Sequence, residues 1–276
     1  MRITPFQTGT VSAKLPARVR RSFDSSKPPE IITPAQWSDP LPIFTYLVEH
    51  AEGLLLIDTG ESPAVNEPDF FAGDSVSEQF LRQNFRFEIT PEQEIGAQLR
   101  AHGVEPRDVR WVVLTHLHTD HADGVGAFER SEILVSRREF EAQVRRPRGA
   151  NPGRWPRWFA PHLVEYYPPG AGPFAESYPI TAAGDVQMIP LEGHSTGHAG
   201  VIVWEGEQAI LFAGDATENE ADLLEHRIPG IARSAQEARA SLERIREFAR
   251  QTPTIYLPTH DPAGPARLRA RQVVEA

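Results

Sequence analysis

The segment His116-Leu117-His118-Thr119-Asp120-His121 concentrates metal-ligating side chains within six residues. In an extended chain alternate side chains point to the same side, so His116, His118 and Asp120 would share one side and a turn would bring His121 beside them. The chain has 10 histidines in 276 residues, so three in one hexapeptide argue against a polar loop that is His-rich by chance. Because the chain has no cysteine, only imidazole and carboxylate ligands are available, and zinc accepts both.

Three more ligand-type residues each follow an apolar run, namely His194, Asp215 and His260. The ends of strands on one rim of a sheet are where α/β folds collect functional groups. Together with the hexapeptide they make five histidines and two aspartates, which is more than one tetrahedral ion uses. The sequence therefore predicts two metal ions. The spacing leaves open whether His194 or His198 is the ligand in that segment.

Alternating strand and helix signals predict a single α/β domain of two sheets over residues 1–276. The apolar run 109–114 predicts a buried strand that delivers the hexapeptide to its C-terminal edge. Capping signals at Thr90 and Ser234 predict helices over 91–102 and 235–250. Strands at 41–48 and 54–57 are predicted to form a hairpin around a turn that contains Gly53. Other strands are predicted at 133–136, 186–191, 201–204, 209–213 and 255–257, with a helix at 137–146.

Residues 147–179 interrupt this alternation with eight prolines and seven large aromatic residues. Proline rules out long regular elements in the stretch. Because large aromatic side chains are costly to leave in water, and long ordered loops are usually functional, we expect an aromatic lid over a pocket. A loop packed on the core without touching a ligand is the alternative.

The composition excludes several partners. The formal charge is −10 and the isoelectric point is near 5.5, so the chain repels phosphate backbones and nucleic acid is not expected as a partner. No apolar run reaches the ~20 residues of a membrane span, and the N-terminus lacks the pattern of a secretory signal. A cytoplasmic protein without a membrane partner is expected. The role of the Phe70-Phe71 pair is open: it could be a homodimer contact, a pocket wall or a buried loop anchor.

Five motifs together resemble those of the metallo-β-lactamase superfamily. They are Asp58-Thr59-Gly60, His116–His121, Gly193–His198, Gly214-Asp215 and Thr259-His260-Asp261. The resemblance spans nearly the whole chain and implies an αββα sandwich, in which two mixed β-sheets are flanked by helices and the metals lie at one edge of the sheets. It also implies two zinc ions, although ligand type alone leaves other divalent metals open.

The resemblance implies a role for each ligand-type residue. His116, His118 and His194 would hold the first ion, Asp120, His121 and His260 the second, and Asp215 would bridge both. In this family the first histidine of the Gly193–His198 motif binds metal, so His198 is expected to support the site instead. Asp58 is expected to accept a ring N–H and fix the tautomer of a ligand histidine, with a plain turn residue as the alternative.

Such a centre predicts a hydrolase. A hydroxide that bridges two cations forms at neutral pH because metal binding lowers the pKa of water to about 7. A cation near the carbonyl oxygen stabilises the negative charge that develops there. Asp120 and Asp215 are the predicted catalytic residues, with Asp120 passing the proton to the leaving alkoxide.

Within the superfamily the motifs most resemble those of N-acyl homoserine lactonases, the quorum-quenching branch, which implies a small lactone or carboxylic ester as substrate. These lactonases carry Tyr three residues after the bridging Asp, whereas this chain has Glu218. An ionised carboxylate cannot donate the hydrogen bond that the tyrosine gives to the substrate carbonyl. Either Tyr166, Tyr167 or Tyr178 substitutes, or the substrate is not an acyl homoserine lactone.

Two alternatives remain beside the lactonase. One is another hydrolase of the superfamily, either a phosphotriesterase or a thioesterase of the glyoxalase II kind. A glutathione thioester would need basic residues near the site, and the late cluster Arg267, Arg269 and Arg271 is expected to be a solvated helix face instead. The other is a non-catalytic metal-binding module, which the full set of seven ligands disfavours.

Overall fold

The computed structural model describes residues 1–14, 21–22, 36–67, 69–71 and 76–276. They form two compact units. Unit 1 comprises Met1–Lys14 and Trp37–Leu163, and unit 2 comprises Val164–Ala276 with the short strand β2 (Arg21–Ser22). None of the helices in these described ranges is both long and apolar enough to cross a membrane. A single domain over residues 1–276 stays a prediction.

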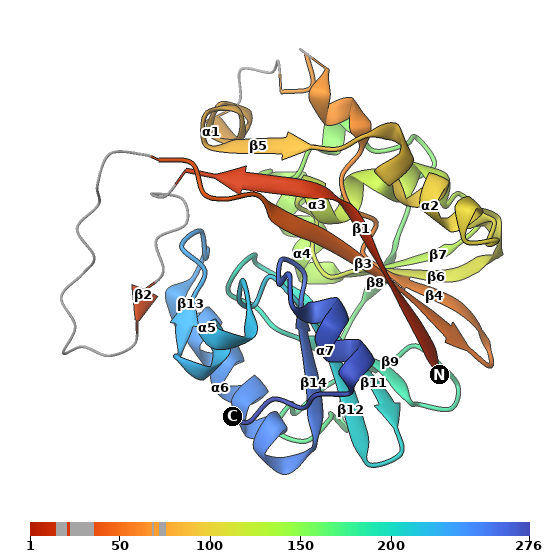
Figure 1. Cartoon of the computed structure of the whole chain (residues 1–276), viewed down its shortest axis with the longest axis vertical. Coiled ribbons are helices and arrows are strands. Elements are labelled where there is room, and N and C mark those ends of the chain that lie inside the picture. Colours follow the sequence, from red (N-terminus) through yellow and green to blue (C-terminus); the bar gives the residue numbers. More distant parts are fainter. Residues whose placement is uncertain (15–20, 23–35, 68, 72–75) are drawn as a thin grey trace. The chain divides into compact units, whose positions relative to one another are not determined.

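Unit 1 is built on a mixed seven-stranded sheet with the strand order β5-β1-β3-β4-β6-β7-β8 (Figure 1). Strands β5, β1, β3 and β4 pair antiparallel, whereas β4, β6 and β7 pair parallel. The predicted hairpin of β3 and β4 is confirmed. The strands are β1 (Arg2–Ala13), β3 (Leu41–His50), β4 (Gly53–Ile57), β5 (Phe85–Glu88), β6 (Val109–Leu114), β7 (Glu132–Ser136) and β8 (His162–Val164).

Helix α2 (Ile95–Ala101) covers part of this sheet. Its Ile95 and Leu99 are fully buried in one hydrophobic core with Val112 and Leu114 of β6. The predicted capping box of Thr90 is present, but Glu94 at ψ 136° separates its 3-10 turn from α2. The other helices of unit 1 are α1 (Val76–Asn84), α3 (Thr119–Ala122) and α4 (Arg137–Arg145), with 3-10 turns at Pro63–Asn66, Pro91–Gln93, Pro106–Asp108, Asp123–Ala127 and Pro152–Arg154.

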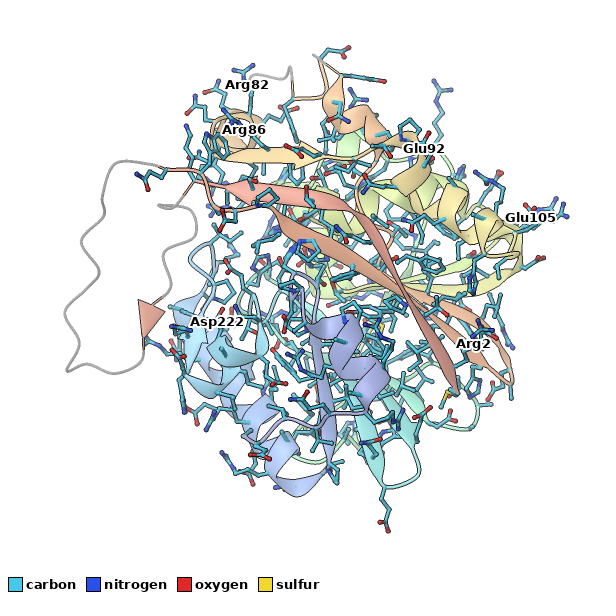
Figure 2. The ribbon with its side chains drawn as sticks, in the orientation of Figure 1. Arg2, Arg82, Arg86, Glu92, Glu105 and Asp222 are labelled. Carbon is cyan, nitrogen blue, oxygen red and sulfur yellow. The ribbon has the colours of Figure 1, made fainter. Side chains whose placement is uncertain are left out.

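Strand β6 carries the hexapeptide His116–His121, with its predicted metal ligands, to the edge of the sheet. Val112, Val113 and Leu114 are fully buried, and the strand pairs with β4 on one side and β7 on the other. Apart from exposed Arg110 near its start, the strand is apolar, as expected for a parallel strand with both faces covered. By contrast, Glu92 and Glu105 in the turns around α2 are exposed (Figure 2). The predicted strand 109–114 is confirmed.

Unit 2 is built on a mixed five-stranded sheet with the order β14-β12-β11-β10-β9. Only β12 and β14 pair parallel among its described strands. Helix α6 (Ala235–Gln251) begins where predicted, because the Ser234 side chain accepts a hydrogen bond from the N–H of Glu237. Its Leu242 and Phe248 pack against Leu211 and Tyr256 of the sheet in one buried core.

The remaining elements of unit 2 are short. The sheet strands are β9 (Tyr178–Pro179), β10 (Val186–Pro190), β11 (Ala199–Glu205), β12 (Gln208–Gly214) and β14 (Thr254–Pro258), and a separate ribbon pairs β2 with β13 (Arg227–Ile228). Helices α5 (Glu220–Leu224) and α7 (Gly264–Ala270) follow β12 and β14. Each therefore begins a few residues after a predicted ligand, α5 after Asp215 and α7 after His260.

Residues 147–179 form only short elements, as their prolines predict. Trp155 stacks on Phe140 with ring centroids 5.8 Å apart, and both partly buried side chains pack against the core of unit 1. Phe174 is fully buried in the core of unit 2, where it packs against Phe248. The segment is thus anchored in the hydrophobic cores, as a loop packed on the core would be. Its role as a lid stays a prediction.

The sequence did not predict strand β1, and it left the role of the Phe70-Phe71 pair open. Strand β1, twelve residues long, was not foreseen, because a bulge between Gln7 and Thr10 breaks the alternation that marks a strand. Phe70 is 2% exposed and packs edge-on against Phe71 at 4.7 Å. Of the three alternatives for this pair, the buried loop anchor is the one that the contact favours.

Truncation of Phe174 tests whether the proline-rich segment is a structural part of unit 2. Phe174→Ala should lower the free energy of unfolding by about 3–5 kcal/mol, because a fully buried ring is lost and a cavity remains. Tyr167→Ala, at an exposed position in the same segment, should change it by less than about 0.5 kcal/mol. Urea unfolding followed by circular dichroism measures both, and equal effects would contradict the anchoring role.

Candidate metal centre

The four hexapeptide residues with ligand atoms lie directly after β6, within unit 1. His116 and His121 are fully buried, and α3 carries Asp120 and His121. The ring of His116 lies 4.4 Å from that of His118 and 4.0 Å from that of His121, measured between centroids. The predicted gathering of three imidazoles is therefore present, brought about by the extended His116–His118 stretch followed by one helical turn.

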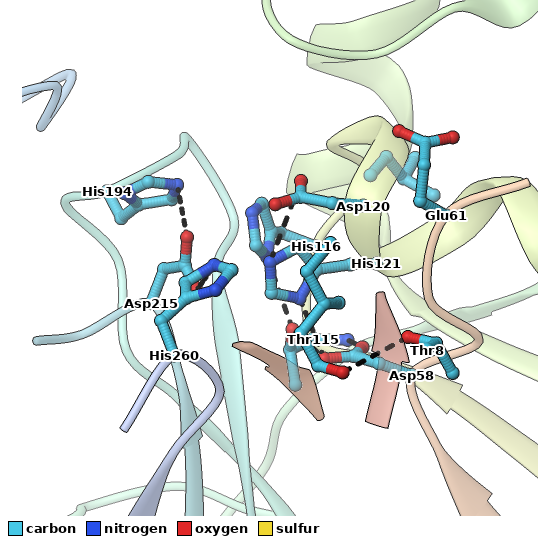
Figure 3. A network of polar contacts seen from close by, with 12 residues as sticks. Thr8, Asp58, Glu61, Thr115, His116, Asp120, His121, His194, Asp215 and His260 are labelled. Carbon is cyan, nitrogen blue, oxygen red and sulfur yellow. Dashed lines mark hydrogen bonds and ion pairs between the residues drawn. The ribbon is translucent and has the colours of Figure 1, made fainter. Parts of the chain in front are cut away.

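The Asp58 carboxylate organises this group (Figure 3). It is 2% exposed, and it accepts hydrogen bonds from the N–H of Thr115 at 2.7 Å and the hydroxyl of Thr115 at 2.9 Å. Nδ1 of His121 lies 2.9 Å from the same carboxylate, so this nitrogen carries the proton and donates. Nε2 is then the basic nitrogen of His121, the one that can bind a metal.

The same network fixes the tautomer of His116. The Thr115 hydroxyl has a single proton, which it gives to Asp58, so it can only accept from the His116 Nδ1 atom 3.1 Å away. Nδ1 of His116 therefore carries the proton and Nε2 is basic. Asp58 thus orients two imidazoles at once, one directly and one through Thr115, as the predicted supporting role requires.

His118 is positioned by packing rather than by the Asp58 network. Its ring lies against Gly149, where an added Cβ would come within 2.3 Å of the ring carbon Cδ2. The carbonyl of Gly149 also accepts a hydrogen bond from the N–H of Thr119 at 3.0 Å. Buried Glu139 of α4 accepts the N–H of Leu117 at 3.3 Å. The backbone on both sides of His118 is therefore held in place.

Two further carboxyl groups lie beside Asp120. Burial raises the pKa of Glu61 well above its usual range, the charges of Asp123 and Asp120 add to the rise, and hydrogen bonds from Thr119 and Ser62 oppose it. Burial, with the charge of Asp120, also raises the pKa of Asp123 to about 8. This part of unit 1 thus concentrates carboxyl groups that retain protons without a cation, and a nearby cation would favour their ionised forms.

In unit 2 the Asp215 carboxylate lies between two of the predicted ligands (Figure 3). Its Oδ2 is 3.4 Å from Nε2 of His194, and its Oδ1 is 3.4 Å from Nε2 of His260. Each oxygen of one carboxylate therefore faces a different histidine. All three residues come from loops after strands of the same sheet, β10, β12 and β14.

His198 uses both ring nitrogens within unit 2. Nδ1 lies 3.1 Å from the Leu191 carbonyl, so it donates there, and Nε2 accepts the backbone N–H of Asp215 at 2.9 Å. The ring is fully buried. A histidine with both nitrogens engaged in this way supports the backbone of Asp215 and has no lone pair left for a metal, which favours His194 as the ligand of this segment.

The predicted substrate residues all lie in unit 2. Tyr166 is half-buried, whereas Tyr167 is 47% exposed and packs edge-on against Tyr178. Glu218 is half-buried in the turn between β12 and α5. A role in substrate binding stays a prediction for each of them.

The donor set in each unit fits a divalent metal. Unit 1 offers histidines with basic Nε2 atoms beside Asp120, and unit 2 offers two histidines that flank one carboxylate. These are nitrogen and oxygen ligands with oriented supporting partners, as metal sites require. The fold and its His and Asp residues therefore imply a divalent metal, typically zinc in this kind of site.

Sequence reasoning missed four residues that support this group. They are Glu61, Asp123, Glu139 and Gly149. Glu61 directly follows the Asp58-Thr59-Gly60 motif, and Asp123 lies two residues after the hexapeptide, so both are close to a recognised motif. Glu139 and Gly149 carried no such signal, because their contacts depend on where α4 and the following loop return in three dimensions.

Comparison with known proteins connects this site to a family. The model of the Metallo-beta-lactamase superfamily matches residues 38–260. An N-acyl homoserine lactonase of Bacillus thuringiensis is 31% identical over 245 residues, which cover 88% of this chain and 90% of that protein. A probable metallo-hydrolase of Mycobacterium tuberculosis is 31% identical over 197 residues, covering 69% of this chain and 62% of that protein.

Solved structures show the same fold. A structure of an N-acyl homoserine lactone hydrolase, with the product N-hexanoyl-L-homoserine bound at its catalytic metal center, matches with a TM-score of 0.77 and 24% identity, covering 99% of this chain and 97% of the other. A probable metal-dependent hydrolase of Staphylococcus aureus matches with a TM-score of 0.68 and 20% identity, covering 94% and 89%. Two mixed sheets flanked by helices are thus the expected and the observed fold.

The raised pKa of Glu61 predicts how the stability of the metal-free protein depends on pH. A folded-state pKa above the unfolded value means that stability is greatest below the unfolded pKa and is lost as pH rises toward the folded pKa. The free energy of unfolding should therefore fall above pH ~5, by up to about 1.4 kcal/mol per pH unit for each proton retained.

The substitution Glu61→Gln keeps the side-chain shape without a titrating group, so it should flatten this fall. Urea unfolding in chelator at pH 5 and pH 8 measures the effect, with exposed Glu129→Gln as the matched control. A pH dependence in Glu61→Gln as steep as that of the wild type would contradict the role assigned to Glu61.

Proposed function

The chain belongs to the metallo-beta-lactamase superfamily, and from this membership we propose that it is a binuclear zinc enzyme that opens the ring of N-acyl homoserine lactones. It is a metal-dependent hydrolase, the class to which its curated relatives belong. The observation that carries the proposal is the Asp215 carboxylate, which presents one oxygen to His194 and the other to His260. A carboxylate in that arrangement suits a bridge between two ions.

The proposed ligand sets follow the family pattern. His116, His118 and His194 would hold one ion, Asp120, His121 and His260 would hold the other, and Asp215 would bind both. The basic Nε2 atoms of His116 and His121 support this assignment, since their Nδ1 protons are committed to Thr115 and Asp58. His198 supports it by holding the backbone of Asp215 instead of competing for metal.

Zinc, when bound, would polarise the lactone carbonyl and lower the pKa of a water molecule to about 7, which supplies the nucleophile at neutral pH. Asp120 is then proposed to take up the proton and deliver it to the oxygen that leaves the opened ring. The Asp58 carboxylate accepts the Nδ1 proton of His121 and so holds that imidazole in one tautomer. Asp215 keeps a fixed backbone position through His198.

The choice of a lactone rests on the relatives. Proteins 31% identical over 88% of this chain are N-acyl homoserine lactonases. Glu218 stands where those enzymes are expected to carry a tyrosine, so Tyr166 or Tyr167 is proposed to contact the substrate carbonyl instead. An apolar acyl chain gains roughly 0.8 kcal/mol per buried CH₂, which is the physical basis for recognising long acyl groups.

The thioesterase alternative loses part of its support. Arg267 is 7% exposed and pairs with Glu220 and Asp261, so the expected solvated face of α7 is wrong at this residue. Arg271 pairs with Glu205, and Arg269 alone of the three is both exposed and without an ion pair to a described residue. A glutathione-binding cluster of three arginines is therefore not available on α7. A cytoplasmic location, a homodimer, and the absence of membrane and nucleic-acid partners stay predictions.

Metal analysis and a lactone panel test the proposal on one preparation. The expected result is about two zinc ions per chain and acid release from N-acyl homoserine lactones with C6 to C12 acyl chains. A phosphotriester and a glutathione thioester serve as comparison substrates. If the protein binds two ions but turns over only a comparison substrate, it is the alternative hydrolase that acts on that substrate and not a lactonase. If it binds no metal after zinc loading, the whole proposal is overturned.

Substitution of Asp120 tests its proposed proton transfer. Asp120→Asn should lower kcat by about 100-fold or more, the usual range for a lost general acid or base, while KM changes little. Zinc content must be measured in the same sample, because Asp120 is also a proposed ligand. Asp108→Asn, exposed on the same unit, is the control, and an Asp120→Asn enzyme with full metal content and normal kcat would refute the role.

A further inference from the structure

Arg267 of α7 is a buried arginine whose three donor nitrogens reach three different segments of unit 2. Nε lies 2.7 Å from the Glu220 carboxylate, Nη2 lies 2.9 Å from the Asp261 carboxylate, and Nη1 donates to the carbonyl of Tyr256 at 3.0 Å. The residue is 7% exposed. A guanidinium presents its donors in a rigid planar fork, so these three contacts fix the three segments relative to one another.

Each of these segments adjoins a proposed metal ligand. Asp261 directly follows His260, and Tyr256 lies in the strand that leads to it. Glu220 opens helix α5, five residues after Asp215. The fork therefore spans the two loops that carry Asp215 and His260, without touching either ligand.

Further hydrogen bonds join the same two loops. Asp261 Oδ2 accepts the backbone N–H of Glu220 at 3.2 Å, and the backbone N–H of Thr259 donates to the Gly214 carbonyl at 3.0 Å. The hydroxyls of Thr217 and Tyr256 are 2.9 Å apart. Together with Arg267, these contacts form a polar network that links the loop after β12 to the loop after β14.

The charge balance makes Arg267 the central member of this network. Two carboxylates, Glu220 and Asp261, face one guanidinium, and both are largely withdrawn from solvent, with side-chain exposures of 16% and 4%. Burial raises the pKa of Glu220, and the charge of Arg267 opposes that rise. Without the guanidinium the two carboxylates would repel each other across the junction of the two loops.

We propose that Arg267 is a positioning residue that sets the spacing between Asp215 and His260 and thereby determines how tightly the ion bound by His260 is held. The inference rests on the proposed binuclear centre. The distance it controls is that between the Asp215 carboxylate and Nε2 of His260, 3.4 Å apart. The ion held by His116 and His118 takes only Asp215 and His194 from unit 2, so its affinity depends far less on the His260 loop.

The experiment is a cobalt(II) titration of the metal-free full chain, followed by visible absorption and by competition with a chelator. Arg267→Lys keeps the charge but cannot span three acceptors, so it should weaken one of the two binding steps by about 10-fold or more, within the range for partners that orient ligands. The other step should keep its wild-type affinity and its absorption band. Arg269→Lys, exposed on the same helix, is the matched control and should leave both steps unchanged.

Glu220→Gln provides a second, milder test. It keeps the Arg267 guanidinium and replaces one of its charged acceptors by a neutral one. It should weaken the same binding step by a smaller factor, about 3-fold, and it decides the question if Arg267→Lys does not fold by circular dichroism. Wild-type affinity for both ions in the folded variants would overturn the inference. A wild-type chain that binds no cobalt would instead overturn the binuclear centre itself, so the two failures are distinguishable.

Discussion

The Asp58 carboxylate is the constraint on which unit 1 depends. Its backbone has φ 57°, a conformation that costs a residue with a side chain of order 1 kcal/mol. Three hydrogen bonds offset that cost, and they run to Thr115 and His121, on the loop that carries the hexapeptide. Each of these bonds involves a charged acceptor in a buried place, where such bonds are strong. The tautomers of His116 and His121 follow from this one group.

In unit 2, different side chains hold the segments around the proposed ligands in place. The loops that carry its proposed ligands follow strands β10, β12 and β14, and in the described part of this unit no carboxylate at a strained position connects them. Instead the imidazole of His198 connects the end of β10 to Asp215, and the guanidinium of Arg267 connects the loops after β12 and β14. In both units buried polar side chains therefore hold the segments that carry the proposed ligands through hydrogen bonds and ion pairs.

The sequence predicted what depends on local pattern. The strand 109–114, the hairpin after residue 41, the capping box at Thr90 and the helix from Ser234 are all present, since each is encoded by neighbouring residues. Strand β1 escaped because its bulge disrupts the alternation of side chains. Arg267 was misjudged because its neighbours look like a charged helix surface, and only the return of α7 toward Asp261 and Glu220 buries it. The spacing of residues along the chain does not show a contact, such as that of Arg267 with Glu220, between segments that are far apart in the sequence.

The packing of the His118 ring on Gly149 has an evolutionary consequence. Gly149 has φ 78°, a left-handed backbone conformation that favours glycine. A side chain at this position would also collide with the His118 imidazole. It lies at the start of the proline-rich stretch, so that start packs against a proposed ligand. Descendants of this chain are therefore expected to keep glycine at this position, because any replacement would push the His118 ring aside.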